Sequence, residues 1–200
     1  DQTGQGLDYA YIDKIMSPNL KLQIGKQVLY HGGWEAVVSS KDEYSFSPLG
    51  FSRYSVGVGA FIKGAGQNVI IQVLNSGSDE TNQTTPLFGA QWSTSLFEGM
   101  INPIASYHVE SIENKASTGA QKANKAYLAV GHRLQIADVT FDVDYLSNKE
   151  ESTTINVKES HNSGYALRLA YQTGLWRPQL KYTDSEIETN GVKSSDKVIY

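Results

Sequence analysis

Strict alternation of polar and apolar residues is the feature that most constrains this chain. It recurs in ten or so short segments that cover nearly the whole sequence. In the clearest one, residues 136–145, two sets of side chains alternate: Ala137, Val139, Phe141, Val143 and Tyr145 in one set, and Asp138, Thr140, Asp142 and Asp144 in the other. Successive side chains of a strand point to opposite faces, so this pattern predicts β-strands, whereas a helix could not separate the two sets.

The connections between these segments are expected to alternate between short and long. Short turns are expected at 17–19, 64–67, 98–99, near 135 and at 173–174, and long polar loops at 28–52, 76–86, 113–124, 148–162 and 185–196. Short periplasmic turns and longer outer loops are typical of outer-membrane barrels. We therefore predict an all-β fold, an antiparallel up-and-down transmembrane β-barrel built as a meander of hairpins. Residues 1–200 would form a single barrel domain, an incomplete part of a larger barrel of about 16–18 strands.

Bulk composition does not oppose this prediction. The mean hydropathy of −0.37 and the 40% hydrophobic content would suit a soluble protein, but a membrane barrel places apolar side chains only at every second position. No run approaches the roughly 18–20 apolar residues of a membrane helix. The chain has no cysteine, which excludes disulfides and thiolate metal sites. Its net charge of −4 and its dispersed lysines and arginines argue against a nucleic-acid partner.

The two faces of the expected strands differ in a way that favours a membrane. One face mixes aliphatic residues with aromatic residues near segment ends: Tyr107, Tyr145, Tyr165, Tyr171, Trp176 and Tyr182. The other face is polar and charged in mid-strand. A lipid-facing exterior with aromatic girdles and a wet lumen would produce this pattern. A large antiparallel sheet with one solvated face is the alternative.

Two neighbouring stretches carry a family resemblance. Residues 6–13 and 17–27, with the sequence LKLQIGKQ at 20–27, are similar to a porin hairpin, and Gly32-Gly33-Trp34-Glu35 and 39–42 resemble the start of a long porin loop. The chain thus resembles Gram-negative outer-membrane porins of the general diffusion or phosphate-selective type. The resemblance implies a homotrimeric, water-filled channel for small hydrophilic solutes or ions, in contact with outer-membrane lipid and lipopolysaccharide. It also implies that the loop 28–52 folds into the pore, where Glu35, Asp42 and Glu43 are constriction-loop candidates.

Charged residues of the expected lumen face are candidates for pore lining. They form an acidic group, Asp138, Asp142 and Asp144, and a basic group on the next two segments, Arg168, Arg177 and Lys181. An acidic wall beside a basic wall would set a transverse field, and rows of charge set ion preference in channels. The plainer interpretation is a set of solvated charges paired across strands.

The remaining motifs do not point to catalysis. The four histidines are scattered, and although His108 and Glu110 share a face, no metal-binding pattern occurs. No serine has a nucleophile-elbow context. We therefore expect no enzymatic activity, no metal and no cofactor. Two rival functions remain: an outer-membrane barrel enzyme, and a soluble or surface β-sheet module that binds carbohydrate through Trp34, Trp92 and Trp176.

Overall fold

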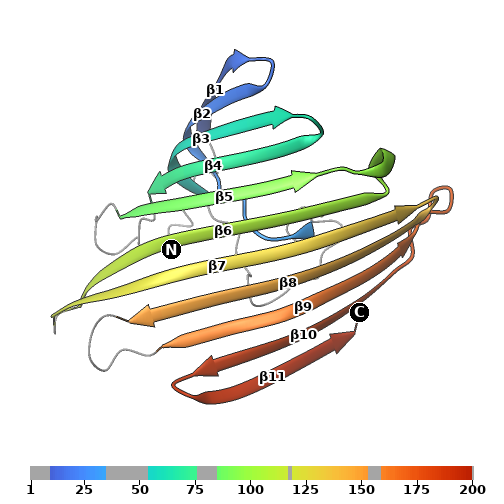
Figure 1. The fold of residues 1–200 in the computed structure, drawn as a ribbon. Helices are drawn as coiled ribbons and strands as arrows, with labels where there is room; N and C mark the ends of the chain where they lie inside the picture. The colour runs from blue at the N-terminus through green and yellow to red at the C-terminus, as the bar shows by residue number, and fades with distance from the viewer. Residues whose placement is uncertain (1–9, 35–53, 76–84, 117–118, 153–158, 200) are drawn as a thin grey trace, which may run out of the picture.

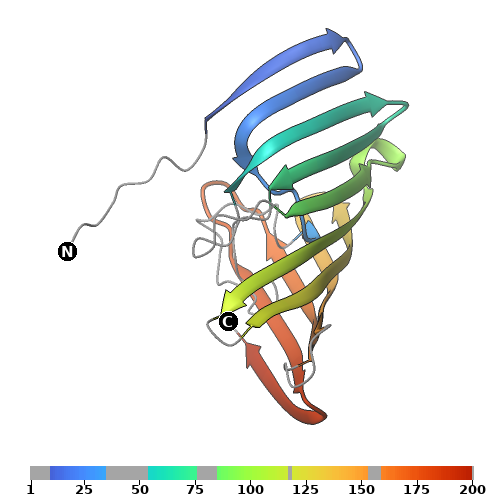
Figure 2. The same cartoon turned by 90° about the vertical axis from the view of Figure 1, so that its left-hand side faces the viewer.

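The computed structural model describes residues 10–34, 54–75, 85–116, 119–152 and 159–199. These residues form one curled antiparallel sheet in which eleven strands follow each other in chain order (Figures 1 and 2). The strands are β1 Ala10–Ser17, β2 Leu20–Val28, β3 Tyr54–Gly64, β4 Gln67–Asn75, β5 Pro86–Thr94, β6 Ile101–Ala116, β7 Gly119–Ile136, β8 Val139–Ser152, β9 Ser160–Tyr171, β10 Gln179–Thr189 and β11 Val192–Ile199. A 3₁₀ turn, η3 Phe97–Gly99, lies between β5 and β6.

Every neighbouring pair of strands is antiparallel, so the predicted up-and-down meander is confirmed. The sheet is open, since no pairing between β1 and β11 joins its two edges. No helix in the described ranges is long and apolar enough to cross a membrane.

The sheet is polar inside and apolar outside. Buried side chains on the concave side include Gln23, Gln72, Ser106, Asp142 and Arg168, whereas large apolar side chains are exposed on the convex side, among them Val56, Ile71, Phe88, Val130 and Leu169. A soluble sheet would bury its large aliphatic residues instead. The sheet therefore has the polarity of a barrel that faces lipid, as the alternation predicted.

Two of the predicted long loops, 113–124 and 148–162, are shorter than expected. β6 and β7 run to Ala116 and from Gly119, and β8 continues to Ser152. These strands of 16, 18 and 14 residues exceed the roughly 9–11 residues that cross a bilayer. The ends of these strands consist of polar and small residues, so no apolar set alternates there to reveal a strand.

The predicted loop 185–196 is a tight hairpin instead. β10 and β11 meet at Asn190 and Gly191, whose φ angles are 51° and 78°. Positive φ at both central residues defines a type I′ turn, for which Asn-Gly is the strongest short-range signal. The predicted alternation of short and long connections therefore fails at this hairpin, and also between β6 and β7, where Ala116 pairs with Gly119. For β10 and β11, the Asn-Gly dipeptide could have revealed the turn.

Candidate functional site

The chain after β2 turns inward and lies against the concave wall. Leu29 packs with Leu74 of β4 and Leu87 of β5 in a small apolar cluster. The backbone N–H of Tyr30 then donates to Gln72 Oε1 at 2.9 Å, which fixes the segment to β4. Residues 29–34, which we call the inner segment, are thus held on the wall from their first residue.

Two further strands hold the middle of the inner segment. On β6, Ser106 accepts a hydrogen bond from Gly32 N–H at 2.9 Å and donates one to the carbonyl oxygen of Gly32 at 3.1 Å. A Cβ atom on Gly33 would overlap the carboxylate of Asp144 on β8, so this glycine permits the close approach of the inner segment to the wall. Gly131 on β7 lies on the other side of the same carboxylate and leaves room for it.

Trp34 ends the inner segment in three contacts. Its backbone N–H donates to Asp144 Oδ1 at 2.9 Å, and its indole N–H donates to the carbonyl oxygen of Asn102 at 2.7 Å. The guanidinium carbon of Arg133 lies 4.1 Å from the centre of a Trp34 ring, a cation–π distance. The inner segment is therefore bonded to β4, β6 and β8 and stacked on β7.

A charged row crosses four strands beside Trp34. Arg133, Asp142, Arg168 and Lys181 are register partners on β7, β8, β9 and β10. Asp142 accepts two hydrogen bonds from Arg133, at 2.6 and 3.0 Å, and further ones from Arg168. Two guanidinium groups thus share one buried carboxylate, an arrangement in which each charge needs its partner.

The structure places the sequence-predicted pore residues unevenly. Asp142, Asp144, Arg168 and Lys181 are buried on the concave wall. Asp138 is not on the wall, because the chain turns there between β7 and β8, and Arg177 is exposed in the connection before β10. Both residues continue the polar–apolar alternation in the sequence, but they lie beyond the ends of β8 and β10. Outside a strand, alternate side chains no longer point to the same face. The constriction-loop candidates Glu35, Asp42 and Glu43 lie outside the described residues.

The predicted acidic and basic walls are also not separate surfaces. Asp142 is bonded to Arg133 and Arg168, so opposite charges interleave in one row. Arg133 was not among the predicted pore residues; it lies two residues before the short turn expected near 135. Gly131, inside a strand pattern, was the available signal for a close approach at this point.

A second polar set lies on β6. Ser106, His108 and Glu110 alternate on its inner face, and all three are buried. The ring of His108 is 5.9 Å from that of His31, edge to face, and neither ring nitrogen of His108 has a hydrogen-bond partner in the described structure. Ser106 is bonded to Gly32, and Glu110 accepts a hydrogen bond from Tyr127 at 3.3 Å. Within the described ranges, no group of three or more acidic or histidine side chains is placed to hold a metal.

The three tryptophans do not form a common platform. Trp34 lies against the inner wall, Trp92 donates to Gln67 across β5 and β4, and Trp176 is exposed in the turn before β10. The three sites belong to different surfaces of the sheet. The geometry therefore gives no support to a carbohydrate platform built from them.

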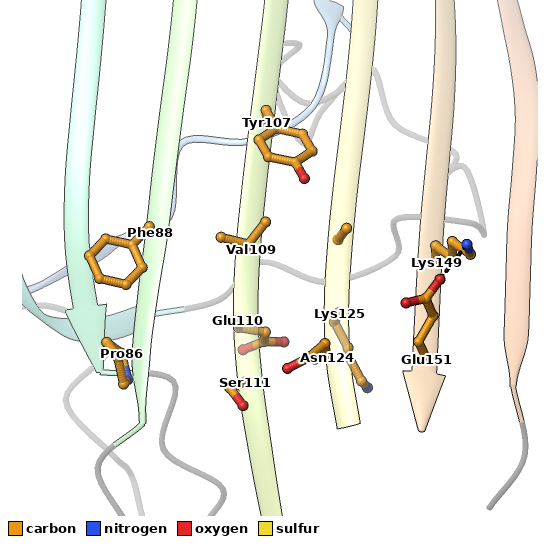
Figure 3. A pocket seen from close by; sticks show the side chains of 11 residues that line it. Pro86, Phe88, Tyr107, Val109, Glu110, Ser111, Asn124, Lys125, Lys149 and Glu151 are labelled. Carbon is orange, nitrogen blue, oxygen red and sulfur yellow. Dashed lines mark ion pairs between the residues drawn. The ribbon is translucent and has the colours of Figure 1, made fainter. Parts of the chain in front are cut away.

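A groove of about 440 Å³ lies on the convex side, near the outer ends of β5–β8 (Figure 3). Its floor is Val109 and Ala126, and Phe88 and Tyr107 stand beside it. Polar side chains border it toward the strand ends: Ser111, Asn124, Lys149 and Glu151. The groove is separated from the inner segment by the thickness of the sheet.

Comparison with solved structures supports the barrel directly. The chain is similar to a loop L8 deletion mutant of OmpT, an outer membrane protein of Vibrio cholerae, with 14% identity, a TM-score of 0.74, and coverage of 97% of this chain and 67% of that one. The fold is that of an outer-membrane β-barrel protein. Outer-membrane expressed OmpT matches with 14% identity, a TM-score of 0.73, and coverage of 97% and 64%. An in-vitro folded OmpT described as a trimer form matches with 15% identity, a TM-score of 0.67, and coverage of 92% and 60%. No family model and no curated protein matches the chain.

This match confirms the predicted fold class. The neighbours are outer-membrane proteins of Vibrio cholerae, which supports the predicted Gram-negative outer-membrane location and, with it, contact with lipid and lipopolysaccharide. The chain spans about two thirds of the length of these structures. The prediction that the chain is not an enzyme is wrong, because enzymatic activity can no longer be excluded. All of these neighbours are OmpT, and their description as outer-membrane proteins names no channel. Since one fold serves many functions, catalysis stays among the candidates.

Proposed function

We propose that this chain is part of an outer-membrane channel through which small hydrophilic solutes and ions diffuse passively. The observation that supports this best is the inner segment, which occupies the concave side and is fixed to β4, β6 and β8. In a channel, a chain segment bonded to the polar wall narrows the lumen at that level. The surrounding glutamine, serine and threonine side chains make the interior polar, unlike the apolar core of a soluble β-protein.

The charged row gives this channel a basis for ion preference. Arg133, Asp142 and Arg168 lie beside Trp34 at the end of the inner segment, so ions that pass there cross the field of the row. We also propose that the full protein assembles as a homotrimer. The in-vitro folded OmpT that is described as a trimer form supports this assembly.

Planar-bilayer conductance of the full-length protein in a salt gradient tests the channel. Stepwise openings are expected, with a reversal potential whose sign gives the preferred ion. Absence of openings from heat-modifiable, folded protein would overturn the proposal. Cross-linking of the folded protein tests the assembly, for which a trimer band is expected and a monomer would contradict it.

A barrel enzyme is the second candidate, favoured by Ser106, His108 and Glu110 on one face of β6. Serine, histidine and carboxylate are the residue types of acyl-transfer catalysis. In the described structure Ser106 and Glu110 have other partners, so a substrate would need to rearrange them. Hydrolysis of ester and peptide substrates by the folded protein, with His108→Ala as the comparison, tests this candidate. Turnover that His108→Ala abolishes, without any conductance, would favour the enzyme.

A further inference from the structure

The convex groove combines an apolar floor with a charged border. Phe88, Val109, Ala126 and Lys149 are successive register partners across β5–β8. The next row toward the strand ends is Ser111, Asn124 and Glu151. The apolar band of the sheet thus ends within the groove. Lys149 lies in the same row as Val109, and the next outward row, two residues further along the strands, is entirely polar (Figure 3).

This position corresponds to one leaflet of the membrane. The groove lies at the end of the strands opposite the tight turns that join β5 to β6 and β7 to β8. In outer-membrane barrels the longer connections lie on the outer side, and the longest one here, between β2 and β3, starts at the groove's end of the sheet, so the groove faces the outer leaflet at headgroup depth. The molecule that occupies the groove must therefore place an acyl chain on the membrane side of the groove and a polar headgroup at its charged border.

The size and shape of the groove fit such a molecule. A volume of about 440 Å³ lies within the roughly 300–1,000 Å³ of typical ligand pockets. Val109 and Ala126 are small beside Phe88 and Tyr107, so the floor is recessed between aromatic side chains and the stem of Lys149. Apolar surface of this kind gains from each buried methylene of an acyl chain.

Lys149 supplies the charge for the headgroup. Its side chain is 59% exposed and forms an ion pair with Glu151, which is 53% exposed. Exposed pairs of this kind contribute little, so a phosphate can replace Glu151 at the ammonium group. Charge-assisted bonds from lysine to phosphate are among the stronger polar contacts.

We propose that this groove is a binding site for a phosphorylated, acylated lipid of the outer leaflet, of the lipid A class. One acyl chain lies over Val109 and Ala126 between Phe88 and Tyr107, and a phosphate lies at Lys149. The proposal depends on the outer-membrane fold and not on the channel, because every residue named faces away from the lumen or lies at the groove border.

Native mass spectrometry of the full protein, folded in non-ionic detergent and titrated with purified lipid A, tests the site. Ala126→Phe fills the floor, and Lys149→Glu reverses the charge at the headgroup position. Each is expected to weaken lipid A retention about tenfold, the equivalent of roughly two buried methylenes. Phosphatidylethanolamine is expected to bind the wild type and both variants equally weakly.

Matched controls separate the groove from the rest of the surface. Ala105→Phe changes an outward alanine on β6 nearer the tight turn, and Lys193→Glu changes a lysine that is 60% exposed and ion-paired with Glu186. Both are expected to retain lipid A like the wild type. Equal retention by Lys149→Glu and the wild type would overturn the proposal, and so would equal loss in the controls. A change of oligomeric state without a change in lipid A binding would assign the groove to a second copy and also overturn it.

The change of electrophoretic mobility on heating shows whether each variant is folded. Should Ala126→Phe fail to fold, Lys149→Glu, which changes only an exposed side chain, decides the result. Conductance of the same samples is recorded separately. Loss of lipid binding with unchanged openings would support the groove independently of the channel, and absence of openings with intact lipid binding would overturn only the channel.

Discussion

The backbone N–H of Trp34 donates a hydrogen bond of 2.9 Å to Asp144 Oδ1, which joins residues 110 positions apart in the chain. Asp144 is almost fully buried on the inner wall. The carboxylate fits there because Gly33 and Gly131 on either side lack a Cβ atom. This one contact links the end of the inner segment to the middle of the barrel wall, and the geometry of the proposed lumen depends on it.

Removing the Asp144 carboxylate is expected to loosen the inner segment. A hydrogen bond to a charged acceptor contributes about 1.5–3 kcal/mol, and Asp144→Ala leaves the Trp34 N–H without it. We expect larger and noisier single-channel openings in planar bilayers. Asp144→Asn keeps a carbonyl oxygen at the same position and is the control, with conductance near that of the wild type. Identical openings in Asp144→Ala and the wild type would show that the segment is held without this contact.

Gly131→Ala is expected to destabilise the folded protein. The added Cβ would overlap the carboxylate of Asp144 and a methyl group of Ile104. Overpacking of this kind costs about 1–3 kcal/mol, which would be measured as a lower urea midpoint of the protein in detergent. Gly64→Ala is the matched control, because a Cβ there meets no atom within 4 Å. A midpoint shift that is the same for both variants would refute the role of Gly131 as space for Asp144.

Asp142→Asn is expected to change both stability and ion preference. It leaves Arg133 and Arg168 without the carboxylate that they share, and breaking a buried ion pair costs about 3–5 kcal/mol. In a salt gradient the reversal potential should move toward anion preference, because the row gains net positive charge. Asp138→Asn removes the same charge in an exposed turn and should leave the reversal potential unchanged. An equal shift in both variants would contradict the assignment of Asp142 to the lumen.

Leu169→Arg is expected to impair membrane assembly. Leu169 is 48% exposed and points outward in the middle of the apolar band. Arginine on the lipid face costs about 2–4 kcal/mol at the bilayer midplane and about 0–1 kcal/mol near the interface. Ser163→Arg, on the same face of β9 but near its outer end, is the control and should fold normally. The fraction of heat-modifiable protein after refolding into vesicles measures both, and equal yields would reverse the assigned faces.

The phase of the strands was readable from the sequence because burial in a membrane barrel follows a period of two. Val139 and Phe141 were expected outside and Asp142 and Asp144 inside, and the structure confirms this division. The same reasoning failed for Asp138 and Arg177, which continue the pattern beyond the ends of their strands. The outer ends of β6, β7 and β8 were missed, since their polar and small residues contain no apolar set that alternates.

The sequence by itself determined the fold class, the order of the hairpins and the face on which each strand residue lies, because these depend on local alternation and on turn residues. Only the tertiary structure decided that Trp34 meets Asp144 and Arg133, that Arg133 and Arg168 share Asp142, and that Val109 and Ala126 form one groove. Those contacts depend on the stagger of strands far apart in the chain and on the curl of the sheet. Neither the stagger of the strands nor the curl of the sheet produces a periodic pattern in the sequence, so these contacts could not be predicted from it.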